Sequence, residues 1–456
     1  MTSKYIFQTA LSVLSIVLFI SCLGGSSAVD IEPSRDAQIY AFSMEAHRDA
    51  DSARLLPATR FTIDQVNGRI FNQVFLPYQF SVDSVVLSIG GSQASLRGLS
   101  EVKIHLINPD SSFTLNRNDS IYISRLAKIE TTAEDGKNQK TYDFQLNIYQ
   151  QDPFIISWTR LSNAYLPSPI QAQKTIELDK RFITYYTAGG AISATYSTDG
   201  VNWTNSTLTG LPATTQLSLI TSSNNAAYVI DDANNVYKTT DGLNWSAVAT
   251  SHPVVTIYGV LPSSTGGRIL IVVNDNGTLK FAQTDDFSTI TLKNELPSNI
   301  VNNIPMAEFS ATQIDRSTTS YSVRYIVLAG GVTRNGLLNS NNIWILHENS
   351  GAIQALDVQT SMSLQGSSLF FYDDRLYALV TTPDGKNTLM FSKRYGLEWT
   401  ETGEDQTFPD NFTYRTYASV ITDTGDYIWM FGGRTPVGEF SDAWRGRLNR
   451  LDEEDR

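Results

Sequence analysis

The chain has 456 residues, of which 41% are hydrophobic, 11% aromatic and 18% charged, and its net charge is −12. This composition excludes an intrinsically disordered or coiled-coil protein, and the length allows two or three packed domains. The acidic balance, without any Lys/Arg-rich run, argues against nucleic acid as a partner.

The N-terminus has the layout of an export signal. Lys4 and the α-amine give a small positive region, and an apolar run of suitable length follows. The run ends in Leu18-Phe19-Ile20-Ser21-Cys22, in which a small residue precedes the only cysteine of the chain. This end resembles the lipobox of bacterial lipoproteins. The resemblance implies that Cys22 is lipidated and becomes the first residue of the mature chain.

We therefore predict a signal peptide over residues 1–21, and a lipidated Cys22 that begins a flexible tether over 22–35. The lipid would anchor the protein to the membrane. We expect an outer-membrane lipoprotein that faces either the periplasm or the cell surface. The alternatives are a buried Cys22 or a plain membrane anchor.

Residues 36–152 carry strand signals and no long helical period. Val102, Ile104 and Leu106 alternate with polar neighbours, and so do the apolar residues of TYDFQLNIY, residues 141–149. Such period-two alternation indicates strands with one buried face. About seven short strands favour an immunoglobulin-like β-sandwich, and another all-β topology fits nearly as well.

Residues 153–450 contain a repeat. The stretch YSTDGVNWT, residues 196–204, returns as YKTTDGLNWS, residues 237–246. Aromatic residues end further units, each preceded by a strand–turn–strand pair, at Phe287, Trp344, Trp399 and Trp444. Such a unit is typical of a four-stranded blade, and the region predicts a β-propeller of six blades, although seven would also fit. An acidic tail over 451–456 follows.

Trp158-Thr159-Arg160, just after the predicted domain boundary, is similar to the strand that follows the tryptophan in each repeat. We predict that it pairs into the last blade and closes the ring. Closure would leave no exposed sheet edge.

The two Ser/Thr-x-Asp-Gly-x-Asn-Trp stretches resemble the Asp-box, a hairpin loop of sialidase-like propellers. The resemblance implies a structural role away from any active centre, and sugar binding by these loops is the alternative. A third copy keeps the full spacing but replaces aspartate with Arg394. The residues concerned are Ser197, Asp199, Gly200 and Trp203; Thr239, Asp241, Gly242 and Trp245; and Ser392, Gly396 and Trp399.

Two other units differ, because a Gly-Gly pair precedes a later tryptophan. They resemble kelch repeats, in which the glycines let strands crowd at a turn. The residues are Gly330, Gly331 and Trp344, and Gly432, Gly433 and Trp444.

Residues that could carry catalysis are scattered. A sialidase would show an Arg-Ile-Pro motif, which is absent, and converging arginines; Arg268, Arg324, Arg375 and Arg434 are the candidates, with strand-end or surface positions as the simpler interpretation. The Asp231-Asp232, Asp285-Asp286 and Asp373-Asp374 pairs fall at expected turns, where aspartate usually bonds its own backbone. The four histidines lack metal-binding spacing, so we predict neither a metal nor a cofactor.

The whole arrangement resembles an uncharacterised lipoprotein family of Bacteroidota-type bacteria with an N-terminal β-domain and a C-terminal Asp-box/kelch-like propeller. We expect a non-enzymatic binding protein of the cell envelope that presents a propeller face to a glycan or a protein. The alternatives are a divergent sialidase-like glycoside hydrolase or lyase, and an envelope protein scaffold. Exposed aromatic candidates for the ligand face are Tyr185, Tyr186, Phe412 and Tyr414.

Overall fold

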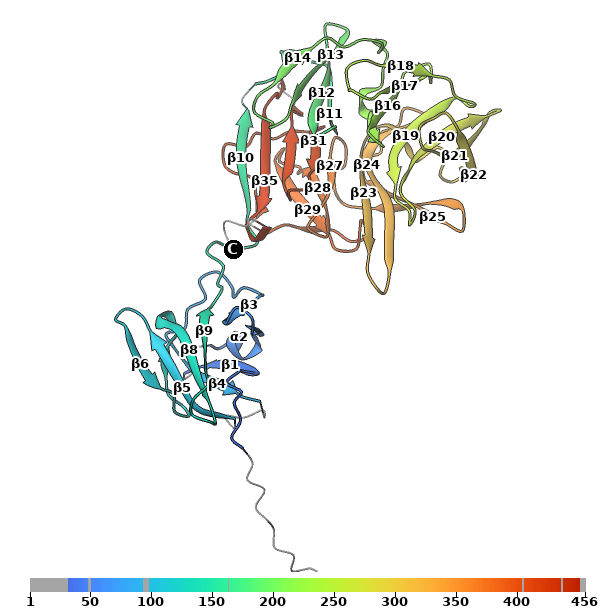
Figure 1. Ribbon diagram of the computed structural model, residues 1–456. Helices are drawn as coiled ribbons and strands as arrows, with labels where there is room; N and C mark the ends of the chain where they lie inside the picture. Colours follow the sequence, from blue (N-terminus) through green and yellow to red (C-terminus); the bar gives the residue numbers. More distant parts are fainter. Residues whose placement is uncertain are drawn as a thin grey trace, which may run out of the picture. The chain divides into compact units, whose positions relative to one another are not determined.

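The computed structural model describes residues 32–47, 51–92, 98–162, 164–403, 406–435 and 438–451 (Figure 1). Two compact units divide the chain between Gln150 and Gln151. The predicted signal peptide, Cys22, most of the tether and residues 452–456 of the predicted acidic tail lie outside the described residues. No helix in the described ranges is long and apolar enough to cross a membrane.

The N-terminal unit is built from strands, with one short helix and one 3-10 turn. Its elements are β1 (Ala41–Ala46), α2 (Leu55–Ala58), β2 (Phe61–Asp64), β3 (Arg69–Asn72), β4 (Ser84–Gly90), β5 (Leu99–Leu106), β6 (Ser111–Thr114), β7 (Ile121–Tyr122), η1 (Ile123–Arg125), β8 (Leu126–Ala133) and β9 (Gln139–Gln145). One sheet has the order β1-β4-β7 and the other the order β2-β3-β9-β8-β5-β6. All neighbours are antiparallel except β3 and β9.

One hydrophobic core serves both sheets of this unit. Met44 of β1 and Ile104 of β5 are fully buried in it, as the alternation of apolar and polar residues predicts. Tyr142 of β9 is also fully buried, and its hydroxyl donates to the Gln65 side chain at 2.7 Å and accepts the Ile39 amide at 3.0 Å. The polar end of a buried tyrosine is thereby satisfied.

The C-terminal unit consists of strands with short 3-10 turns. Its elements are β10 (Ile156–Ser162), β11 (Ala172–Leu178), β12 (Arg181–Ala188), β13 (Ala191–Ser197), β14 (Thr204–Ser206), η2 (Leu217–Leu219), β15 (Thr221–Ser223), β16 (Ala226–Ile230), β17 (Val236–Thr239), β18 (Ser246–Val248), β19 (Val254–Leu261), β20 (Arg268–Asp275), β21 (Thr278–Thr284), β22 (Ile290–Glu295), β23 (Pro305–Ser317), β24 (Ser322–Thr333), β25 (Asn342–Asn349), β26 (Ala352–Gln359), β27 (Ser368–Tyr372), β28 (Arg375–Thr381), β29 (Asn387–Ser392), β30 (Thr400–Glu401), β31 (Ser419–Thr422), β32 (Ile428–Phe431), β33 (Arg434–Thr435), β34 (Gly438–Glu439), β35 (Ala443–Leu448) and η4 (Asn449–Leu451).

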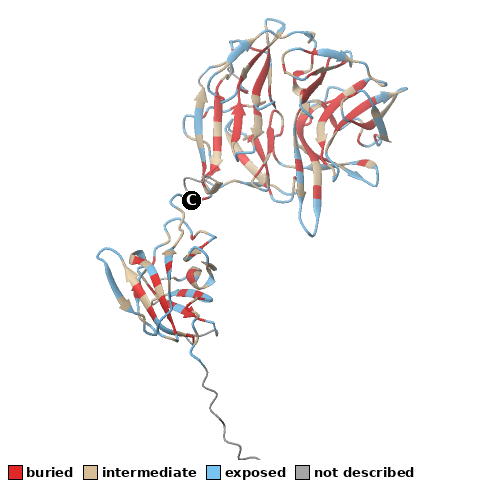
Figure 2. Ribbon diagram, in the orientation of Figure 1, coloured by how far each residue is buried: buried red, intermediate tan, exposed pale blue. Residues whose placement is uncertain are grey.

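These strands form a ring of four-stranded antiparallel sheets. Five sheets are consecutive along the chain, β11 to β14, β15 to β18, β19 to β22, β23 to β26 and β27 to β30. The innermost strands β11, β15, β19, β23, β27 and β31 each contact the next, and β31 contacts β11 again. Buried residues lie mainly in the inner strands of the sheets, and exposed ones in the outermost strands and the connections (Figure 2). This closed ring of radial sheets is a β-propeller, as the repeats predict.

The closing sheet combines the two ends of the propeller segment. Its order is β10-β35-β32-β31, and β10 pairs antiparallel with β35, Ile156 facing Leu448 and Arg160 facing Trp444. The prediction that Trp158-Thr159-Arg160 pairs into the last repeat is therefore confirmed.

A buried ion pair joins the segments that precede β31 and β35 of the closing sheet. Arg415 and Asp442 are each 2% exposed, and their side chains approach to 2.5 Å. The same carboxylate accepts hydrogen bonds from the Trp444 indole at 3.0 Å and pairs with Arg160 at 3.2 Å. The buried charge thus has several donors, which a desolvated carboxylate requires.

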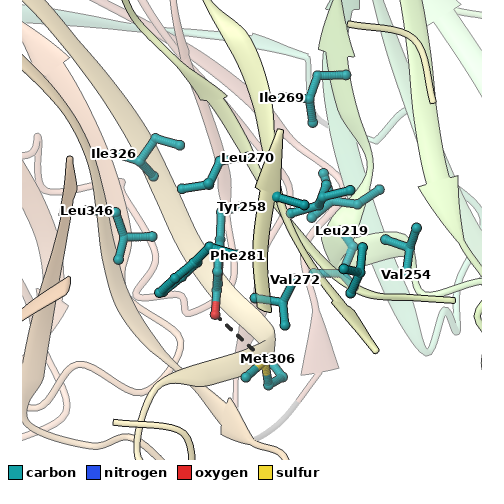
Figure 3. Close-up of a cluster of buried hydrophobic side chains, with 14 of the residues drawn as sticks. Leu219, Val254, Tyr258, Ile269, Leu270, Val272, Phe281, Met306, Ile326 and Leu346 are labelled. Carbon is teal, nitrogen blue, oxygen red and sulfur yellow. Dashed lines mark hydrogen bonds between the residues drawn. The ribbon is translucent and has the colours of Figure 1, made fainter. Parts of the chain in front are cut away.

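Apolar side chains of neighbouring sheets interlock between the blades. Figure 3 shows Tyr258 of β19, Phe281 of β21 and Ile326 of β24 among a cluster of buried residues. The Tyr258 hydroxyl donates to the Pro305 carbonyl at 3.1 Å, which links β19 to the start of β23. Burial of this kind, repeated around the ring, holds the innermost strands in place.

Candidate functional site at the central channel

The two Asp-Gly turns, residues 197–203 and 239–245, connect the third and fourth strands of neighbouring sheets. In the first, the Asp199 carboxylate accepts the Val201 and Asn202 amides at 2.9 and 2.8 Å. The Ser197 hydroxyl accepts the Gly200 amide at 2.9 Å. Hydrogen bonds from its own backbone, with the Asn202 amide first, hold the pKa of Asp199 well below its usual range.

The second turn repeats this geometry. Asp241 accepts the Leu243 and Asn244 amides at 2.8 Å each, and Thr239 accepts the Gly242 amide at 2.9 Å. Burial raises the pKa of Asp241, but the hydrogen bonds outweigh it, so this pKa also lies well below its usual range. Since the carboxylates are occupied with their own loops, these turns have little capacity left for a ligand.

The tryptophans of the turns pack differently. Trp203 stacks on Tyr165, with ring centroids 4.0 Å apart, and its indole donates to the Gly200 carbonyl at 3.1 Å. Trp399 likewise donates to the Gly396 carbonyl at 3.0 Å. The Trp245 indole, by contrast, has no partner among the described residues, and the Gly242 carbonyl instead accepts the Tyr185 hydroxyl at 2.7 Å.

Phe287 does not occupy the tryptophan position that its place in the repeat predicts. The Thr284 hydroxyl accepts the Phe287 amide at 2.7 Å, just as Thr239 accepts the Gly242 amide. Phe287 therefore takes the glycine position, with φ of 67°, and is fully buried against Tyr228. Burial of its ring offsets the cost of this unfavourable backbone region.

The glycine pairs lie at comparable places in their sheets. Gly330 and Gly331 fall within β24, Gly432 and Gly433 follow β32, and all four have positive φ. Trp344 in β25 and Trp444 in β35 are both 1% exposed. These residues belong to the packed interior.

The aromatic face predicted from the sequence is wrong for three of its four residues. Tyr185 is fully buried, and Tyr186 and Phe412 are each only 7% exposed. Tyr185 packs edge-on against Trp245 in the turn of the next sheet. Tyr186 belongs to a cluster with Leu166 and Ile170 of the segment before β11. Phe412, in the connection before β31, stacks on Phe408. Tyr414 alone is exposed, at 42%.

The four candidate arginines do not all meet at one site, although Arg268 and Arg324 both line a third cavity, of about 690 Å³. The turn aspartates do not line that cavity. Arg268 pairs with Asp285 at 3.0 Å and Arg324 with Asp315 at 3.3 Å, while Arg375 lies over the Phe391 ring. The other turn aspartates are also engaged, Asp231 with the Ala233 and Asn235 amides, Asp286 with Ser288, Asp373 with Arg450 and Asp374 with Arg316. Only Arg434 and Asp232 lie at the central channel.

The central channel holds two cavities. The first, of about 500 Å³, is lined by the start of β11, by η2, by β23 and by the segments before β27 and β31. The second, of about 780 Å³, is lined farther along by β11, β15, β19, β23 and β31. Three residues, Lys174, Ser218 and Phe309, line both. The first cavity is within the size range of small-molecule sites.

Charged and strained residues mark the rim of the first cavity. Asp232, Glu308 and Arg434 line it and are exposed. Glu308, in β23, has φ of 54°, and its amide donates to the Ser218 hydroxyl at 3.2 Å. A non-glycine residue in this backbone region is uncommon, and such strain often occurs at functional sites.

Lys174 is the charged residue shared by both cavities. It is partly buried, and burial lowers the pKa of its ammonium group. In the second cavity, burial and the nearby Asp423 raise the pKa of the Glu177 carboxyl. Within the described ranges no three histidine, cysteine, aspartate or glutamate side chains gather as a metal site.

Sequence reasoning missed Lys174 and its neighbours. The channel is assembled from strands far apart in sequence, and no motif marks it. A sequence signal for its strand existed, because Lys174 precedes Thr175 and Ile176, two β-branched residues that favour strands.

Fold and channel define a β-propeller protein with a smaller all-β domain at its N-terminal side. The chain belongs to the DUF6242 family. Residues 152–454 match the DUF6242 beta propeller domain, and residues 38–146 match the DUF6242 N-terminal domain, a domain of unknown function. No curated protein sequence matches the chain.

Several solved structures are similar to this chain at low sequence identity. YjhT has 12% identity and a TM-score of 0.41, covering 61% of this chain and 94% of its own. The six-bladed fucose-recognising lectin of Aleuria aurantia has 11% identity and a TM-score of 0.37, and the match covers 60% of this chain and 91% of the lectin chain. A Trypanosoma rangeli sialidase mutant with trans-sialidase activity has 10% identity and a TM-score of 0.38, and the match covers 64% of this chain and 59% of the sialidase chain. Such identities say nothing of what this chain binds.

Proposed function

We propose that this protein is a non-enzymatic binding protein of the cell envelope, whose ligand, a glycan or a protein segment, enters the first channel cavity. The observation that carries the proposal is the cavity of about 500 Å³ at one end of the channel, lined by polar and apolar side chains of several inner strands. Rigid strands around a mixed cavity suit recognition of a polar ligand.

Each four-stranded sheet is one blade of a six-bladed propeller in this proposal, and residues 197–203 and 239–245 are Asp-boxes that staple the blades. The N-terminal unit is an immunoglobulin-like spacer. Lipidated Cys22 anchors both to the outer membrane. A Cys22→Ser variant would then fail to incorporate labelled palmitate, and a wild-type chain that incorporates none would exclude the anchor.

Glycan hydrolysis is the second candidate, because two carboxylates, Asp232 and Glu308, line the same cavity. Glycosidases use two carboxyl groups across the scissile bond. Binding is favoured since both side chains are exposed at the rim, whereas a glycosidase general acid is usually desolvated.

A glycan array probed with residues 25–456, followed by analysis of the bound glycans for cleavage, tests the proposal. Ala172, exposed at the cavity wall, becomes tryptophan in the blocking variant, and exposed Ala191, outside the cavity, in the control. We expect binding without cleavage that Ala172→Trp abolishes and Ala191→Trp leaves intact.

Two results contradict the proposal. Cleavage that disappears in Asp232→Asn or Glu308→Gln would establish hydrolysis instead. Binding that survives Ala172→Trp would move the ligand site away from the cavity. If no glycan binds, pull-down from envelope extracts with the same variants decides between a protein ligand in the cavity and a scaffold surface elsewhere.

A further inference from the structure

The ammonium group of Lys174 has no partner in the described part of the chain. Lys174 lies in β11 and lines both channel cavities, and neither a hydrogen bond nor an ion pair of its side chain occurs among the described residues. Its pKa is lowered by burial, without a contribution from a nearby charge. This ammonium is partly buried and has no protein partner, so it would stabilise an anion that enters the cavity.

Two neutral groups of the first cavity are also unsatisfied. The Ser367 hydroxyl and the Gln173 side-chain oxygen are buried and have no hydrogen-bond partner in the described ranges, and both residues line the first cavity. The Gln173 amide nitrogen donates to the Phe431 carbonyl at 3.0 Å, which fixes which end of the amide is the free acceptor. Buried polar groups are rarely left unpaired, so these two call for a partner such as an ordered water, an ion or a ligand group.

The unpaired polar groups of this cavity include both donors and an acceptor. Lys174 and Ser367 supply donors, whereas the Gln173 oxygen supplies an acceptor. A carboxylate offers acceptors only, so it matches the first two, and the Gln173 oxygen needs a hydroxyl donor beside it. A sugar acid has a carboxylate and hydroxyl groups within one ring. The other charged groups around this cavity, Asp232, Glu308 and Arg434, lie exposed at its rim.

We propose that the first cavity binds the carboxylate of an acidic sugar, with Lys174 and Ser367 donating to the carboxylate and the Gln173 oxygen accepting a ring hydroxyl. The inference rests on the proposed binding function and names the class of its ligand. The source is either a free hexuronate or a unit of an acidic polysaccharide, and both present the same group.

Calorimetric titration with matched sugars tests this proposal. The probes are a galacturonate oligosaccharide, free galacturonate and the corresponding neutral galactose sugars, which differ from them at the carboxylate. The variants are Lys174→Met and, as a control with the same loss of charge, Lys137→Met, whose side chain is exposed in the N-terminal unit. Circular dichroism of each variant confirms that it folds.

We expect the wild type and Lys137→Met to bind the acidic sugar with the same affinity. Lys174→Met should bind the acidic sugar at least about tenfold more weakly, and the wild type should bind the galactose sugars more weakly by a similar factor. The reason is that losing a hydrogen bond to a charged group weakens binding by about this factor. Preference for the oligosaccharide would assign a polysaccharide, and equal binding a free sugar acid; both support the site. Equal affinity of Lys174→Met and wild type, or of acidic and neutral sugars, overturns it.

Lysine modification of the wild type gives a readout that needs no substitution. Reductive methylation followed by peptide mass analysis should modify Lys174 less in the presence of the galacturonate oligosaccharide, but not with its galactose counterpart. Unchanged modification of Lys174 would contradict the proposal. If the protein binds a neutral glycan that Ala172→Trp blocks, and binds no acidic sugar, this inference is overturned but the proposed function stands. If it binds no glycan and no protein, both are overturned.

Discussion

The hydroxyl of Tyr185 in β12 donates a 2.7 Å hydrogen bond to the carbonyl of Gly242, in the turn between β17 and β18 of the next sheet. In the two other turns of this type, a tryptophan indole of the same turn binds the glycine carbonyl. Here a neighbouring sheet supplies the donor. The bond therefore ties two sheets together, and Tyr185 serves packing rather than a surface.

Replacing Tyr185 by phenylalanine should remove this link alone. The ring stays buried, but the Gly242 carbonyl loses its donor, and we expect a loss of about 1–2 kcal/mol in the free energy of unfolding. Urea denaturation followed by tryptophan fluorescence measures it. Tyr186→Phe is the control, because no hydrogen bond of the Tyr186 hydroxyl occurs among the described residues. Equal stability of Tyr185→Phe and the wild type would show that the bond contributes nothing.

Gly242→Ala should destabilise the protein more than backbone strain alone explains. Gly242 has φ of 76°, and an added Cβ would lie 2.1 Å from the Ile183 Cδ1 atom of the neighbouring sheet. Gly189→Ala is the matched control, since its φ is 58° and no atom lies within 4 Å of the added Cβ. Urea denaturation should show a loss of about 1 kcal/mol in the free energy of unfolding for the control. For Gly242→Ala, the loss should exceed that of the control by about 2 kcal/mol or more. Similar losses would contradict the role assigned to the close approach of the sheets.

The Asp241 carboxylate should make stability depend on pH in the acid range. Its pKa in the folded protein lies below that in the unfolded chain, which is about 3.9. Its contribution is fully present above that value and is lost as the pH falls towards the folded-state pKa. Asp241→Asn should be less stable at pH 7 by about 1–2 kcal/mol and approach the wild type near pH 2. A difference between the two proteins that stays constant from pH 7 to pH 2 would refute this.

Arg415 and Asp442 should show strong coupling. Removing either partner leaves a buried charge, so Arg415→Met and Asp442→Leu should each cost about 3–5 kcal/mol. The double variant should lose clearly less than the sum, because it leaves neither of these two charges, and the partly exposed Arg160 reaches solvent. A double-mutant cycle in urea measures the coupling. Additive losses would mean that the pair is not energetically linked.

Local pattern was enough to predict much of this architecture from the sequence. The Asp-Gly turns lie between strands three and four of their sheets because their hydroxyl and carboxylate groups bind backbone within a few residues. Trp158-Thr159-Arg160 could be placed in the closing sheet because it is similar to the other repeats. These features depend on neighbours along the chain.

What the sequence could not show depends on neighbours in space. Tyr185 and Phe412 looked like surface aromatics in turn-rich stretches, yet both are buried. Tyr185 packs against Trp245 of the next sheet, and Phe412 stacks on Phe408 of its own connection. Phe287 has a residue type that disfavours positive φ, so only its tertiary burial explains its position. Lys174 becomes conspicuous only when inner strands separated by many residues surround it.

The pairing of β10 with β35 also orders events in time. During synthesis, residues 156–162 emerge long before residues 443–448, with every other strand of the ring between them. The first strand of the propeller therefore stays without its partner until almost the whole domain has left the ribosome. The closing sheet therefore cannot form gradually during synthesis. If translation stopped shortly before residue 443, the truncated chain would keep an unpaired sheet edge that is prone to aggregation.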